Sequence, residues 1–248
     1  MIRKQHLLFG AALATAALVV ACAGGAEESG TAGGGDTGAM LSMNPDDGVP
    51  TFEVDPLFPK NLPNHWLMGP VIGVDVDSRD HIWIVHRNTP DNFVMNTEIG
   101  RMADPPVAQC CQPGPPVMEC DQEGNLVQAW GGPGTETGDY VWPASNHGIT
   151  IDGMDNVWIG GNGGPAAHVL TMERQGNFLM QVGTSGARMT GPVSERTGQP
   201  TPQRDSHAAD SYGRVAKIAV DNEANEAYFS DGYFNRRMAV VDMDSGEL

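Results

Sequence analysis

The chain has 248 residues, and its 32 glycines and 18 prolines, about a fifth of the total, make it rich in turns. Hydrophobic residues account for 40 %, which is enough for a folded core and excludes a wholly disordered chain. The 31 acidic residues outnumber the 14 lysines and arginines, so the formal net charge is −17. A field of that sign repels phosphate backbones, and we expect no nucleic-acid partner.

The first 21 residues have the pattern of an export signal. Arg3 and Lys4 precede an almost wholly apolar stretch over 7–20, which is short for a membrane span. This stretch leads into Val-Val-Ala-Cys, ending at Cys22, which resembles the lipobox of bacterial lipoproteins. We therefore predict a signal peptide over 1–21 and lipidation of Cys22. The product would be exported and anchored by its lipid to the bacterial cell envelope, facing the periplasm or the cell surface. An ordinary secretory signal with an incidental cysteine is the alternative.

Residues 22–50 are predicted to be the lipidated cysteine and a flexible tether. Residues 23–50 contain eight glycines and five acidic residues but no lysine or arginine. Their few apolar side chains cannot offset the entropy lost on ordering them. The folded part is therefore expected over 51–248.

Three cysteines remain if Cys22 is lipidated, which leaves at least one thiol unpaired in an oxidising compartment. Cys110 and Cys111 are adjacent, so a bond between them would be strained. A bridge from Cys120 to one of the pair is the easier alternative. Three cysteines without a second matching Cys/His pair are a weak zinc signal, and we predict no zinc site there.

A repeat begins near residue 70. Three segments align on Asp77, Asp152 and Asp221, which are spaced 75 and 69 residues apart. Each is an alternating apolar run, a polar turn and a second run with a large aromatic residue, which is typical of a β-hairpin. A second hairpin follows the first two copies, with Gly-Asn turns at 124–125 and 176–177, where glycine allows a positive φ.

Four antiparallel strands per repeat are the unit of a propeller blade. The predicted fold class is therefore all-β, a β-propeller of four-stranded antiparallel blades, with a β-sandwich as the alternative. The third copy stops at Leu248, on the turn before its fourth strand. Because propellers close with about four to eight blades, we expect the front half of a longer protein. A chain that closes by dimerisation is the other possibility.

Three segments carry a resemblance to known families, and one of them carries two motifs. Asp231, Asn235 and Arg237, followed by an apolar strand, resemble the core of NHL-type propeller repeats. His-Arg at 86–87, His-Gly-Ile-Thr-Ile-Asp at 147–152 and Ser-Asp-Gly-Tyr-Phe-Asn-Arg-Arg at 230–237 are similar, in order and approximate spacing, to segments of peptidyl-α-hydroxyglycine α-amidating lyases. The resemblance covers residues 70–246. It implies a six-bladed propeller, of which about three blades are present, and zinc-dependent cleavage of a C–N bond giving an amide and glyoxylate.

The resemblance also implies roles for individual residues. His147 would be one of three histidines that bind zinc, an arrangement that leaves one position open for catalysis. Arg87 would hold the carboxylate of the substrate through two parallel donors. Tyr233 would take the proton of the substrate hydroxyl, helped by nearby positive charge. The alternatives are a water-binding histidine in the channel, a structural ion pair of Arg87 with an Asp such as Asp91, and packing of Tyr233 at the blade rim.

A calcium ion in the channel is implied as well, held partly by the backbone oxygens of Val74 and Ile149. The repeat spacing of 75 residues pairs these two positions independently. The other two zinc histidines would lie in blades beyond these repeats, Phe234 replaces a cysteine of the family, and 192–210 has no counterpart. Two functions therefore remain open: a lyase acting on a small peptide-like or carboxylate substrate, and a non-catalytic NHL-repeat propeller that binds a protein or glycan.

Overall fold

The computed structural model describes residues 42–43, 50–88, 104–105 and 110–248, which all belong to one compact unit, Gly38–Leu248. The predicted signal peptide and the lipid anchor at Cys22 lie outside the described residues. Within these residues no helix is long and apolar enough to cross a membrane. The elements are β1 (Ser42–Met43), β2 (Pro50–Thr51), the 3-10 helix η1 (Pro63–His65), β3 (Trp66–Leu67), β4 (Val71–Val76), β5 (Ile82–His86), β6 (Gln112–Pro113), β7 (Val117–Cys120), β8 (Leu126–Trp130), β9 (Asn146–Ile151), β10 (Val157–Gly161), β11 (His168–Met172), β12 (Phe178–Gly183), β13 (Ile218–Asp221), β14 (Glu226–Asp231) and β15 (Arg237–Asp242).

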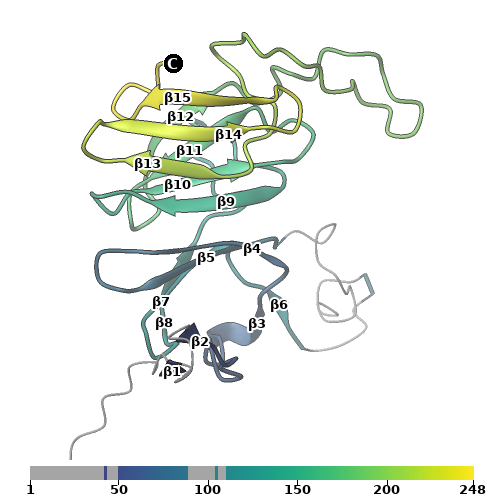
Figure 1. Cartoon of the computed structure of the whole chain (residues 1–248). Helices are drawn as coiled ribbons and strands as arrows, with labels where there is room; N and C mark the ends of the chain where they lie inside the picture. The colour runs from purple at the N-terminus through teal and green to yellow at the C-terminus, as the bar shows by residue number, and fades with distance from the viewer. Residues whose placement is uncertain (1–41, 44–49, 89–103, 106–109) are drawn as a thin grey trace, which may run out of the picture. The chain divides into compact units, whose positions relative to one another are not determined.

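Three antiparallel sheets form the body of the described structure (Figure 1). The first sheet has the strand order β4-β5-β7-β8, the second β12-β11-β10-β9 and the third β13-β14-β15. The predicted hairpins are present as β4–β5, β9–β10 and β13–β14, and the second hairpins as β7–β8 and β11–β12. The prediction of an all-β fold with four-stranded antiparallel units is confirmed, and the third copy contributes three strands.

The repeated aspartates fix the turns of the first hairpins. Asp77 accepts two backbone N–H bonds of its own turn and, at 3.0 Å, a bond from the indole of Trp83. Asp152 accepts the equivalent bonds, including one from the indole of Trp158 at 3.0 Å. A single carboxylate thus satisfies both a tight turn and a buried indole N–H, which explains why Asp and Trp recur at the same spacing.

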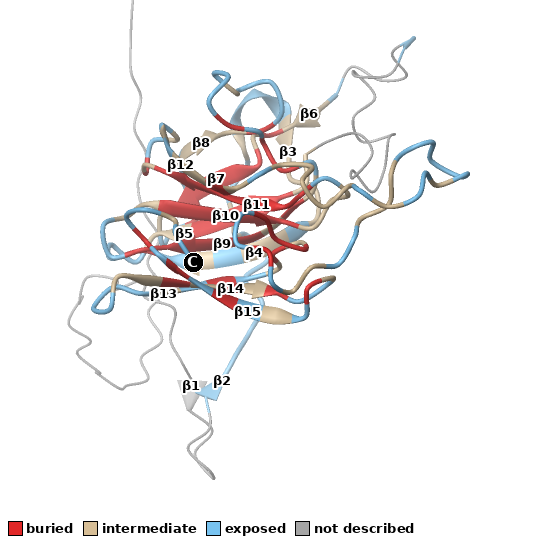
Figure 2. Cartoon of the chain, turned by 90° about the horizontal axis from the view of Figure 1, so that it is seen from above, coloured by how far each residue is buried: buried red, intermediate tan, exposed pale blue. Residues whose placement is uncertain are grey.

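Successive side chains of a strand point to opposite faces of its sheet, and in the first and second sheets side chains on both faces are buried (Figure 2). The first core cluster comprises Trp83, Val85, Val117, Tyr140, Trp142, Ile149, Ile151, Val157, Ile159, Leu170 and Met172. The second cluster comprises Trp158, Val169, Val182, Tyr212, Val215, Ile218, Ala227, Phe229, Ala239, Val241 and Met243. Because strands of the second sheet contribute to both clusters, apolar side chains on its two faces join it to its neighbours. Each fully buried large side chain contributes about 1.5–3 kcal/mol.

The sheets approach one another most closely at their first strands, β4, β9 and β13. A Cβ on Gly73 would lie 3.1 Å from the backbone nitrogen of Ile149, and a Cβ on Gly148 would lie 2.8 Å from the carbonyl oxygen of Ala216. The two glycines are 75 residues apart, which is the repeat spacing. The same close backbone approach therefore recurs between successive pairs of sheets.

The cysteine pairing differs from the expectation. The structure joins Cys110 to Cys111 and leaves Cys120 free, so the alternative bridge from Cys120 is not formed. Register explains why: Cys120 stands between Ile82 and Leu126 in the first sheet, and its buried side chain is committed to an apolar cluster. Burial raises the pKa of the Cys120 thiol to about 11, with smaller contributions from neighbouring carboxylates, so the thiol stays protonated at neutral pH.

Candidate functional site

His147 and Tyr233 meet at one end of the strands. His147 is the second residue of β9, and Tyr233 lies in the turn between β14 and β15. His147 Nδ1 lies 2.8 Å from the carbonyl oxygen of Ala216, and because a carbonyl only accepts, Nδ1 carries the proton. In the neutral ring, Nε2 therefore turns its lone pair toward the Tyr233 hydroxyl, 3.3 Å away. Metal-binding histidines are commonly fixed in this way by a bond from the other ring nitrogen.

A buried carboxylate holds the turn that carries Tyr233. Asp231 accepts hydrogen bonds from the backbone N–H of Gly213 at 2.5 Å and from the side chains of Asn235 and Arg237, each at 2.8 Å. Asp231, Asn235 and Arg237 thus stabilise the turn between β14 and β15. Tyr233 itself remains 53 % exposed.

Arg87 reaches the same end of the strands from the first sheet. Its Nε donates to the carbonyl of Asn146 at 3.4 Å, and its NH2 donates to Oδ1 of Asn162 at 3.2 Å. Asn146 directly precedes His147, so each of the three sheets brings one predicted site residue to this edge. Asp91, the ion-pair partner considered for Arg87, lies outside the described residues.

One of the two backbone oxygens predicted to hold calcium, that of Ile149, already accepts hydrogen bonds from side chains. The carbonyl of Ile149 accepts a hydrogen bond from Lys217 Nζ at 3.0 Å and one from the Thr150 hydroxyl at 2.8 Å. Val74 pairs with Ile84 in the β4–β5 ladder. A calcium ion at the Ile149 carbonyl would have to displace the ammonium group of Lys217, and the calcium site stays a prediction.

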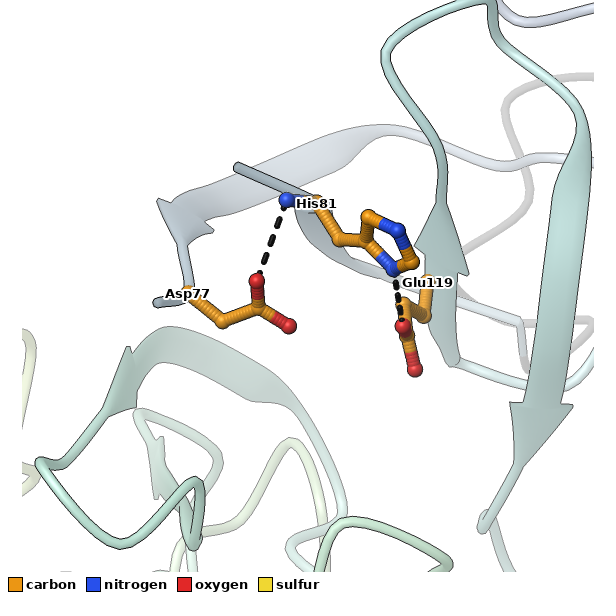
Figure 3. A group of neighbouring side chains, drawn as sticks. All are labelled: Asp77, His81 and Glu119. Atoms are coloured by element: carbon orange, nitrogen blue, oxygen red, sulfur yellow. Dashed lines mark hydrogen bonds and ion pairs between the residues drawn. The ribbon is translucent and has the colours of Figure 1, made fainter. Parts of the chain in front are cut away.

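A second polar group, which the sequence analysis missed, lies at the opposite ends of the strands (Figure 3). It consists of Asp77, His81 and Glu119, whose potential ligand atoms all lie within 4.8 Å of one another. His81 Nδ1 is 2.5 Å from Oε1 of Glu119, and both carboxylates are buried. Imidazole nitrogen and carboxylate oxygen are common metal ligands, so this group could hold a metal ion.

The guanidinium group of Arg174 forms ion pairs with both carboxylates of the Asp77–His81–Glu119 group. It comes from the β11–β12 turn of the second sheet, donates to Asp77 Oδ2 at 2.5 Å and forms a very short contact with Glu119. Burial opposes ionisation of Asp77, but hydrogen bonds from Trp83, the backbone of Arg79 and Arg174 outweigh it and hold the Asp77 pKa well below its usual range. The group is therefore an ion-pair network between two sheets, and a metal ion would compete with Arg174.

The two polar sites differ in what they leave accessible. The Asp77–His81–Glu119 group is paired internally, whereas His147 and Tyr233 face solvent-accessible space. Among the described residues, His147 belongs to no group of three potential metal ligands. No protein-family model matches the chain, and neither does any curated protein.

Proposed function

We propose that the three sheets are successive blades of a β-propeller and that the His147–Tyr233 edge faces its central channel. The convergence of β4, β9 and β13 supports this arrangement, because the innermost strands of radially arranged blades lie closest together. The glycines at 73 and 148 support it further, since both remove a side chain where the neighbouring sheet approaches. We also propose that the protein is exported and anchored at the cell envelope through lipid on Cys22.

The proposed activity is that of a lyase acting on a peptidyl-α-hydroxyglycine. The C–N bond of the substrate breaks, its hydroxyl loses a proton, the nitrogen gains one, and the products are an amide and glyoxylate. The observation that carries the proposal is the 3.3 Å contact between the Tyr233 hydroxyl and His147 Nε2 in a ring whose tautomer is fixed by Ala216. Such a pair places an acid–base group next to a potential metal ligand.

The residues of this chain have distinct parts in the proposed reaction. His147 Nε2 would hold a zinc ion in place of its hydrogen bond with the Tyr233 hydroxyl, which would stay beside the ion. The ion would supply Lewis-acid polarisation of a substrate oxygen. Tyr233, once deprotonated, accepts the proton of the substrate hydroxyl. Arg87, through the carbonyl of Asn146, holds the start of β9 in place beneath His147. A non-catalytic NHL-repeat propeller that binds a protein or glycan is the second candidate, favoured because His147 belongs to no group of three potential metal ligands among the described residues.

The proposal is tested by glyoxylate release from a peptidyl-α-hydroxyglycine, measured on the full-length protein. Tyr233→Phe should lower the rate by about 10²- to 10⁴-fold, the usual cost of losing an acid–base group. Tyr228→Phe is the matched control, because Tyr228 lies in β14 of the same sheet and its hydroxyl donates to Glu226 instead of contacting His147. A wild-type protein that releases no glyoxylate, or a Tyr233→Phe variant as active as Tyr228→Phe, overturns the lyase assignment.

A further inference from the structure

A long loop over residues 184–217 connects the second and third sheets (Figure 1, green). Its own hydrogen bonds hold it together, including one from the backbone N–H of Gly191 to the carbonyl of Thr201 at 2.9 Å. The N–H of Gly186 ties the loop to the carbonyl of Pro165 in the second sheet at 2.8 Å. Its middle part is the segment for which the lyase resemblance offers no counterpart. These hydrogen bonds give the loop a defined conformation, so that it can form one wall of a binding site.

The loop and the 164–165 turn line an open pocket of about 720 Å³, a volume within the range of small-molecule sites. Its walls are largely apolar, and they include Pro165, Met189 and Pro200. Arg196 and Arg214 also line it, whereas no acidic residue does. The net charge of the chain is −17, so a pocket with two arginines and no acidic residue stands out from the rest of the protein. Its apolar walls and its positive charge together favour a ligand that has an anionic group and an apolar part.

Arg214 connects the pocket with the candidate site. Its guanidinium carbon lies 4.5 Å from the centre of the Phe234 ring, and Phe234 follows Tyr233 directly. Burial lowers the pKa of Arg214, while its interaction with Tyr233 acts in the opposite direction. The φ of Arg214 is 73°, in the left-handed region that is costly for a long side chain and that recurs at ligand-binding positions.

The Arg214 guanidinium has no hydrogen-bond acceptor and no carboxylate partner among the described residues, and its Nε is buried without a partner. Arg87 differs, because two of its nitrogens already donate to Asn146 and Asn162. A partly buried cation without a counter-ion is the group that a carboxylate satisfies best, through two parallel N–H donors.

We propose that Arg214, rather than Arg87, holds the carboxylate of the substrate and that the 184–217 pocket receives the apolar side chain beside it. The reaction rests on the proposed lyase function, but the ligand class, a carboxylate with an apolar side chain, follows from the pocket itself. Arg87 is then a positioning residue that acts through Asn146 on His147. The pocket defines specificity for an apolar residue next to the cleaved bond.

The test is isothermal titration of the full-length protein with N-acetyl-phenylalanylglycine and with its C-terminal amide. The two ligands share the apolar side chain and differ only in the carboxylate. Arg214→Ala should weaken binding of the acid by about 10- to 100-fold, the worth of hydrogen bonds to a charged group, and should leave the amide unchanged. Arg214→Lys should lose part of the affinity for the acid, because lysine keeps the positive charge but lacks the two parallel N–H donors of the guanidinium group. Met189→Ser should weaken both ligands alike.

Arg204→Ala is the matched control, since Arg204 is exposed on the same loop and does not line the pocket. The inference is overturned if the wild type binds the acid no better than the amide, or if Arg214→Ala matches Arg204→Ala. Selective binding that depends on Arg214 in a protein without glyoxylate release supports the pocket and rejects the lyase. Glyoxylate release that is insensitive to Arg214→Ala retains the lyase and rejects the pocket.

Discussion

The hydroxyl of Tyr233 lies 3.3 Å from Nε2 of His147, although 86 residues separate them in the chain. The contact depends on the third sheet in two ways, because that sheet carries Tyr233 and the segment leading into it supplies the Ala216 carbonyl that orients the imidazole. Each element of the edge is thus held by the packing of whole sheets. The geometry of this edge and the stability of the sheet interfaces are therefore expected to be coupled in this protein.

The Arg174 network should be a main support of the interface between the first two sheets. Arg174→Ala leaves the buried carboxylates of Asp77 and Glu119 without their cation, and the free energy of unfolding should fall by about 3–5 kcal/mol. Arg79→Ala is the control: it removes an exposed ion pair with Asp155 at 2.9 Å and should cost less than about 1 kcal/mol. Urea unfolding of both variants measures the two free-energy changes. Equal decreases in the free energy of unfolding would contradict a main role of Arg174 at this interface.

Two buried histidines make the fold sensitive to acid. Burial lowers the pKa of His86 and of His168, whose Nε2 atoms donate to the carbonyls of Pro115 at 2.8 Å and Val141 at 2.7 Å. Below about pH 6.5, the ordinary histidine value, the unfolded state binds more protons than the folded state. Their contribution to stability is therefore complete above that pH and is lost as the pH falls through the folded pKa values.

The melting temperature should consequently decrease between pH 7.5 and pH 5.5. His168→Gln keeps an N–H donor but cannot titrate, so its melting temperature should depend less on pH than that of the wild type. His207→Gln, at an exposed position, should retain the full dependence. A His168→Gln protein with the wild-type pH profile would show that the buried imidazole is not the sensor.

Cys120 should behave as an unreactive thiol. Its pKa of about 11, raised by burial, leaves almost no thiolate at pH 8, and the side chain is fully buried. Iodoacetamide should leave Cys120 unmodified in the native protein and label it after unfolding in urea. Peptide mass mapping reads out the site, and rapid native labelling would be inconsistent with a buried thiol in β7.

The elements that could be predicted from the sequence are those that depend on local patterns. Alternation of apolar residues identified the hairpins, and Gly124 and Gly176 have the positive φ values, 80° and 85°, that their turns require. The repeat placed Asp77 and Asp152 in equivalent turns, although their bonds to the indoles emerged only from the structure. His147 and Tyr233 were proposed from resemblance, and the folded sheets bring them together.

The parts that could not be predicted depend on register and on packing between sheets. Glu119 meets the Asp77 turn because it pairs with Trp83 across the β5–β7 ladder, and no spacing in the sequence reveals that register. Arg174 reaches the same place from the next sheet. The pocket beside Arg214 depends on the course of a 34-residue loop over 184–217 without repeat or periodicity. Arg214 carries no local signal that separates it from other loop arginines.

We propose that the functional site of this protein lies at the His147–Tyr233 edge and not at the Asp77–His81–Glu119 group. Zinc content and glyoxylate release, measured together on the full-length protein, test it most directly with His147→Ala and His81→Gln. His147→Ala should lose zinc and activity in parallel, while His81→Gln should keep both at wild-type levels. Loss of zinc and activity in His81→Gln, with both retained in His147→Ala, would contradict it.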